Sequence, residues 1–137
     1  MTGGNLQELI ENHGGKEENL KTYMALFEQM VEGILEIHSK GQMHRDIKPE
    51  NVFLRKGGEN LSSLIVKLGD FGLARDMSST KGEASSYSKG VGTNMYQSPE
   101  LMNDEPYGPA NDIWALGIVL YEMLTGVHPF DTRMNIL

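Results

Sequence analysis

The sequence has no cysteine among its 137 residues, which excludes disulfide bonds and thiolate metal sites. It has no basic tract either: 12 lysines and arginines face 19 acidic residues, for a net charge of −7, so nucleic acid is not an expected partner. No apolar run approaches the ~18 residues of a membrane-spanning helix, and Met1–Gly4 does not open a signal peptide. We therefore expect a cytoplasmic or nuclear protein without a membrane partner.

What is present suits one folded domain, since 39% of the residues are hydrophobic and 23% are charged. Leu6, Leu9 and Ile10 recur at helical spacing and predict a short helix that ends near residues 12–15. A longer helix follows, with Asn19 as its candidate cap and Gly41 in the left-handed position that ends it. Its expected apolar stripe consists of Leu20, Tyr23, Met24, Phe27, Met30, Val31, Ile34, Leu35 and His38.

Two short β-prone runs, residues 51–54 and 64–68, are separated by turn-forming residues and predict a β-hairpin. Residues 73–91 are polar and have no periodicity, so we expect a mobile loop. Further on, residues 113–124 are apolar nearly all round, which is typical of a helix buried on all sides. We expect Asn111 or Asp112 to cap that helix.

The run from His44 to Asn51 carries the chemistry. Asp46 can accept the proton of an incoming hydroxyl, and Lys48 can neutralise a phosphoryl group. Asn51 and Asp70 offer the hard oxygen ligands that Mg²⁺ prefers. This set of residue types at this spacing is what phosphoryl transfer needs.

Other residues have simpler interpretations. The nine methionines are more readily core residues than a cofactor site. His13, His38 and His128 are scattered along the chain, and we do not expect them to form a ligand set. The tripeptide Asp70-Phe71-Gly72 arises often by chance when taken alone, but its order after the run 44–51 makes coincidence a poor explanation.

The sequence resembles the eukaryotic serine/threonine protein kinases, with features of the NIMA-related group. The motifs that carry the resemblance are residues 44–51, 70–72, 92–100 and 112–117. The resemblance implies a mainly α (α+β) fold: the helical C-terminal lobe of a two-lobed domain, with a short β-hairpin at the active site. No glycine-rich loop or strand lysine precedes the motifs, so we expect residues 1–137 to be a partial kinase domain that lacks the N-terminal lobe.

Carried over by position, the resemblance makes Asp46 the catalytic base and Lys48 the contact of the ATP γ-phosphate. Asn51 and Asp70 become the Mg²⁺ ligands, and Phe53 lies under the adenine. The implied cofactors are thus ATP and Mg²⁺.

The resemblance also implies positioning and regulatory residues. Thr93 would brace the base and shape the site for the substrate. Arg45 would hold a phosphate group attached to the loop 73–91. Ser88 is our candidate acceptor, and an upstream activating kinase would transfer the phosphate to it. The residues with implied structural roles are His44, Phe71, Gly72, Glu100, Asp112 and Trp114.

Two functions remain open at this stage. One is a serine/threonine protein kinase that acts on protein substrates and is represented here by an incomplete domain. The alternative is a catalytically inert kinase relic, or a pseudokinase-like binding module. The large-lobe catalytic residues favour the enzyme, whereas the missing nucleotide lobe predicts that this polypeptide alone is inactive.

Overall fold

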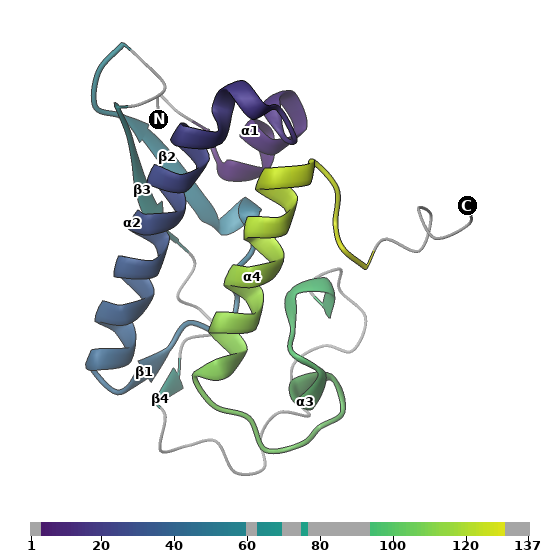
Figure 1. The fold of residues 1–137 in the computed structure, drawn as a ribbon. Helices are drawn as coiled ribbons and strands as arrows, with labels where there is room; N and C mark the ends of the chain where they lie inside the picture. Colours follow the sequence, from purple (N-terminus) through teal and green to yellow (C-terminus); the bar gives the residue numbers. More distant parts are fainter. Residues whose placement is uncertain (1–3, 60–62, 70–74, 77–93, 131–137) are drawn as a thin grey trace, which may run out of the picture.

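The computed structural model describes residues 4–59, 63–69, 75–76 and 94–130. Within these ranges the chain is mainly helical, with two small antiparallel sheets of two strands each (Figure 1). None of the helices in these ranges has the length and apolar character needed to cross a membrane. The helices are α1 (Leu6–His13), α2 (Leu20–Ser39), α3 (Pro99–Met102) and α4 (Ala110–Thr125), and the strands are β1 (Gln42–Met43), β2 (Val52–Lys56), β3 (Leu64–Leu68) and β4 (Arg75–Asp76).

The short helix α1 confirms the sequence prediction. The side chain of Asn5 caps it by accepting a hydrogen bond from the backbone N–H of Glu8, at 3.0 Å. Leu6 and Ile10 face the core, and the helix ends at His13 before the glycine pair 14–15.

The long helix α2 also runs where the spacing predicts. Gly41 has φ +73°, the left-handed conformation expected just past a helix end. Asn19 precedes the helix, but its side chain makes no capping hydrogen bond, because a 3₁₀ turn (Glu17–Asn19) leads in instead.

The buried stripe of α2 is narrower than the apolar pattern suggests. It consists of Tyr23, Leu26, Met30 and Ile34. Leu26 is buried although it was not in the expected stripe. Three members of the expected stripe are exposed, namely Leu20, Met24 and Leu35. Packing on α4 and on the hairpin covers only one side of α2, so apolar residues outside that side stay in water.

The predicted hairpin is present as β2 and β3, which pair from Val52↔Leu68 to Lys56↔Leu64. The side chain of Gln29 in α2 stands in for a further strand along β3. Its Nε2 donates to the carbonyl of Leu64 at 3.0 Å, and its Oε1 accepts from the N–H of Val66 at 2.9 Å. These two bonds satisfy part of the open edge of the sheet.

The strand pair β1–β4 was not predicted. Residues 75–76, which lie in the segment expected to be a mobile loop, pair with residues 42–43. The expectation was wrong for these two residues, because a two-residue strand leaves no periodic signal in a sequence.

The helix α4 lies beside α2 and runs antiparallel to it (Figure 1). Its inner face supplies Ala115, Leu116, Val119 and Met123 to the main core. Two expectations about this helix were wrong. Its first residue is Ala110, so Asn111 and Asp112 lie within the first turn instead of capping it. Its outer face is exposed at Ile113, Tyr121 and Leu124, because the elements packed on α4 in the described ranges lie on its other faces.

Candidate active site

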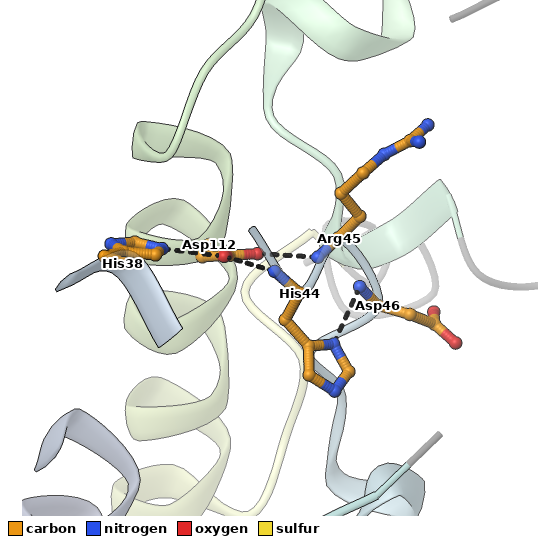
Figure 2. Close-up of polar contacts among 5 residues, drawn as sticks. All are labelled: His38, His44, Arg45, Asp46 and Asp112. Atoms are coloured by element: carbon orange, nitrogen blue, oxygen red, sulfur yellow. Dashed lines mark hydrogen bonds and ion pairs between the residues drawn. The ribbon is translucent and has the colours of Figure 1, made fainter. Parts of the chain in front are cut away.

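The buried carboxylate of Asp112 anchors the loop that follows β1. Its Oδ2 accepts a hydrogen bond from the backbone N–H of His44 and its Oδ1 from that of Arg45, both at 2.8 Å. The Nε2 of His38, from the end of α2, lies 2.8 Å from Oδ2 (Figure 2). Asp112 is only 1% exposed, and a charge so buried is tolerated because these donors replace its water.

The two backbone bonds hold Arg45 in an uncommon conformation. Its φ is +73°, a left-handed value that costs a non-glycine residue on the order of 1 kcal/mol or more. Such a conformation persists only where the surroundings fix it. Asp112 fixes it here, and the resulting turn directs the side chains of Arg45 and Asp46 away from α4 (Figure 2).

The ring of His44 links this turn to the end of β3. The N–H of Asp46 donates to Nδ1 of His44 at 3.1 Å, and Nε2 lies 2.8 Å from the carbonyl oxygen of Gly69. Because Nδ1 accepts, the tautomer that fits both contacts carries its proton on Nε2 and donates it to Gly69. His44 thereby connects Asp46 to the residue directly before Asp70.

Asp46, Lys48 and Asn51 come together in front of this turn. The side-chain Nδ2 of Asn51 donates to the carbonyl oxygen of Asp46 and to its Oδ2, both at 2.9 Å. The ammonium of Lys48 lies 3.9 Å from Oδ1 of Asp46. A 3₁₀ turn (Pro49–Asn51), begun by the fixed φ of its proline, brings Asn51 back toward Asp46.

Asn51 and Phe53 make the join between the loop and the hairpin. The N–H of Gly69 donates to the carbonyl oxygen of Asn51 at 2.8 Å. Gly69 lies so close to the ring of Phe53 that a methyl group at this position would collide with it. Asn5 forms an isolated antiparallel β-bridge with the backbone of Phe53, whose side chain is half-buried.

The guanidinium of Arg45 lies over an aromatic ring. Its Cζ is 5.2 Å from the ring centroid of Tyr107, within the range of a cation–π contact. Tyr107 belongs to a small apolar cluster with Met43 and Leu101. Nearby in sequence, Asn111 accepts a hydrogen bond from the N–H of Ser98 at 2.9 Å, which ties the start of α3 to α4.

A second buried carboxylate, Glu122, lies on α4 beside Tyr96. Burial raises the pKa of Glu122, the negative charge of Glu50 adds to that shift, and the hydrogen bond with Tyr96 and the nearby His128 oppose it. Burial raises the pKa of the Tyr96 hydroxyl as well, and the bond with Glu122 and its charge add to the effect. The edge of the Tyr96 ring packs on His128, with centroids 5.2 Å apart.

The structure therefore brings together six of the residues singled out in the sequence, which are His44, Arg45, Asp46, Lys48, Asn51 and Asp112. Glu100 is half-buried in α3, and the ring of Trp114 stacks on that of Phe130 with centroids 6.1 Å apart. The other expected site residues lie outside the described ranges; they are Asp70, Phe71, Gly72, Ser88 and Thr93.

Sequence reasoning missed His38, Tyr107 and Glu122. His38 is part of the site because it contacts Asp112. The available signal was its place on the apolar stripe of α2, where a polar ring needs a buried partner. Within the described ranges no three His, Cys, Asp or Glu side chains gather as a metal site. The expected ligand pair for Mg²⁺ is of a different kind: the amide of Asn51, which is described, and the carboxylate of Asp70, which lies outside those ranges.

Comparison with known proteins matches residues 1–136 to the protein kinase domain. Serine/threonine-protein kinase Nek3 from Mus musculus is 42% identical over 131 residues, which cover 96% of this chain and 24% of the relative. Nek5 from the same organism is 38% identical over 131 residues, covering 96% and 20%. Cyclin-dependent kinase-like 1 from Caenorhabditis elegans is 43% identical over 133 residues, covering 96% and 34%. The chain thus spans between about a fifth and a third of the length of these relatives. The identities over nearly the whole chain confirm its resemblance to serine/threonine kinases.

Proposed function

Because this chain belongs to the protein kinase family, we propose that the protein carrying it transfers the γ-phosphoryl group of ATP to serine or threonine hydroxyls of protein substrates. The observation that carries the proposal is the convergence of two side chains of the same loop on the carboxylate of Asp46. Asn51 donates to this carboxylate and Lys48 lies beside it. The relatives named as serine/threonine kinases, two of them Nek kinases, support the same acceptor class and a NIMA-related placement.

The chemistry assigned to these residues is mainly positioning and charge compensation. Asp46 takes the proton of the substrate hydroxyl while the oxygen of that hydroxyl attacks the γ-phosphorus of ATP. The hydrogen bond from Asn51 fixes which oxygen of Asp46 is turned toward the substrate, and Lys48 compensates the negative charge of the phosphoryl group. Asp112 and His44 act indirectly, since they hold the backbone that presents Asp46.

The donor set near Asp46 fits a magnesium ion. The amide nitrogen of Asn51 is engaged with Asp46, so its Oδ1 is the atom that can ligate a cation. Asp70 would supply the carboxylate that hard cations prefer. When bound, Mg²⁺ would neutralise charge on the phosphates. Phe53 would lie under the adenine, and the close approach of Gly69 restricts its ring.

We assign the chain to the helical, C-terminal lobe of the kinase domain, with residues 1–137 as a partial domain. Its mainly helical architecture supports this assignment, and so does the sheet β2–β3 beside residues 44–51, the proposed catalytic loop. We further propose that a phosphate on the segment 73–91, with Ser88 as the candidate acceptor and an upstream kinase as its donor, is held by Arg45. The position of Arg45 directly before Asp46 supports that role.

The test uses the protein at its full natural length and the substitution Asp46→Asn. We expect turnover of a serine- or threonine-containing protein substrate to fall by about 10² or more, the scale of losing a positioned base. Glu105→Gln is the matched control, because it makes the same change from acid to amide and Glu105 is exposed in the segment after α3. Equal turnover in Asp46→Asn and wild type would rule out Asp46 as the base. A wild-type protein that binds ATP but transfers no phosphate would favour the inert binding module.

A further inference from the structure

We propose that Tyr107 is a positioning residue of the catalytic loop: its ring is the platform on which the guanidinium of Arg45 rests, and this contact keeps Asp46 in its working position. The inference rests on the proposed function and names a residue for which the sequence motifs predict no role. It also gives a function to a tyrosine that would otherwise be interpreted only as a member of the apolar cluster with Met43 and Leu101.

The geometry of the pair is that of a desolvated cation over a ring. The Cζ of Arg45 lies 5.2 Å from the centroid of Tyr107. Arg45 is 7% exposed and Tyr107 is 8% exposed, so little water competes with the ring for the charge. A cation is attracted to the negative face of an aromatic ring, and this attraction grows as water is removed.

The same short segment grips Arg45 at two places. Tyr107 contacts its side chain, and Asp112, five residues later, accepts its backbone N–H. The strained φ of +73° at Arg45 persists only while its surroundings hold it. Releasing the guanidinium from Tyr107 removes a restraint on the residue that directly precedes Asp46.

Loss of the Tyr107 contact should displace the proposed base, Asp46, and leave the nucleotide site unchanged. Asp46 follows Arg45 directly, and its own N–H is oriented on Nδ1 of His44. A shift of the turn would move the carboxylate of Asp46 against the acceptor hydroxyl, and displacements of about 1 Å can cost 10²-fold in rate. Phe53, which would contact the adenine, lies on the hairpin β2–β3.

The experiment compares Tyr107→Phe and Tyr107→Leu in the full-length protein. Phe keeps the ring face, and we expect kcat within twofold of wild type. Leu removes the ring, and we expect kcat to fall about 3- to 30-fold, the range of a cation–π contact, with the KM for ATP unchanged. Tyr121→Leu serves as the control, because Tyr121 is an exposed tyrosine on the outer face of α4.

The same Leu substitution is then made in an Arg45→Met background. If Tyr107 acts through Arg45, it should lower kcat by less than twofold there, because the cation is already gone. Equal losses in both backgrounds would overturn the inference and leave Tyr107 as a core residue. So would a fall confined to the KM for ATP.

A ring-fluorinated phenylalanine at position 107 covers the case in which Tyr107→Leu fails to fold. Fluorination keeps the shape and weakens the negative face, so kcat should fall with each added fluorine; a flat series would overturn the proposal. The same cycle of variants is followed by thermal unfolding, which needs no activity. A protein without kinase activity would disprove the proposed function, whereas additive shifts in the unfolding midpoint would disprove the Tyr107–Arg45 contact.

Discussion

At the scale of single residues, the site depends on a charge placed in an apolar helix. Asp112 stands at the start of the apolar run 113–124, and a buried carboxylate there is stable only if several donors reach it. The structure supplies these donors from residues 38, 44 and 45, more than 60 positions away. The sequence could indicate that Asp112 needs partners, but nothing in its spacing identifies them.

We expect Asp112→Asn to weaken both the fold and the enzyme. Both oxygens of Asp112 accept hydrogen bonds, whereas an asparagine turns an NH₂ group toward at least one of these donors. A buried donor left unpaired costs about 1–3 kcal/mol, so the free energy of unfolding should fall by about that amount. Urea denaturation and kcat measure the two effects, and Glu105→Gln, at an exposed position, is the control. An unchanged unfolding midpoint would show that the buried anchor contributes no stability.

Glu122 predicts a pH dependence of stability. Its pKa is raised by burial, so between the ordinary carboxyl pKa and the raised value the folded state binds more protons than the unfolded state. Stability should therefore decrease as the pH rises through this window, by at most about 1.4 kcal/mol per pH unit for one group. In Glu122→Gln this contribution disappears, and the variant should be more stable than wild type above the window. Denaturation across the acidic to neutral range tests the sign, and a wild-type curve parallel to that of the variant would contradict it.

At the scale of elements, three glycines join the ends of α1 and α4. The N–H of Gly15 donates to the carbonyl oxygen of Met123 at 3.2 Å, near the last turn of α4. Gly126 ends α4 with φ +80°, and its Cα lies 2.9 Å from the place where a Cβ on Gly14 would be. Backbone contacts this close leave no room for side chains, so the glycines set how α1 packs on α4.

Gly15→Ala should destabilise the protein by more than the strain of its backbone alone. Its φ is +76°, and a Cβ would lie 2.8 Å from the backbone oxygen of Thr125, which cannot move aside as a side chain would. Gly41→Ala isolates the strain, because Gly41 has φ +73° and open space around it. We expect about 1 kcal/mol for Gly41→Ala and about 2–4 kcal/mol for Gly15→Ala, measured by urea denaturation. Gly108→Ala, with open space and no positive φ, should be nearly neutral, and equal effects at 15 and 41 would show that the junction tolerates a side chain.

The elements that the sequence predicted are those with a repeating local pattern. The helices α1 and α2 and the hairpin β2–β3 follow from apolar spacing, the glycine stop after α2 and turn residues. The pair β1–β4 and the exposed face of α4 did not, because both depend on which distant segments pack together. For the site, the motif predicted Asp46, Lys48 and Asn51, whereas His38 and Tyr107 approach from other elements.

At the scale of the whole molecule, the chain contains the proposed catalytic loop but not the kinase motifs that hold the nucleotide phosphates. The groups that we propose to act on the acceptor hydroxyl lie around Asp46. A glycine-rich loop over the phosphates and a strand lysine do not occur before residue 44 in this sequence. The outer face of α4 remains apolar and exposed, a surface of the kind that favours association with other chains.

The isolated 137-residue chain should therefore show little or no phosphoryl transfer. Kinase catalysis needs the strand lysine on the α- and β-phosphates together with the helix glutamate that pairs with it, and the loop around Asp46 cannot replace their hold on the nucleotide. The measurement is ATP-dependent phosphorylation of a generic basic protein by this chain alone, beside the protein at its full natural length. Because a misfolded chain would also be inactive, circular dichroism must first show the helical content of α1, α2 and α4. Robust transfer by the folded chain alone, abolished by Asp70→Ala, would mean that these residues suffice to bind ATP in a reactive position.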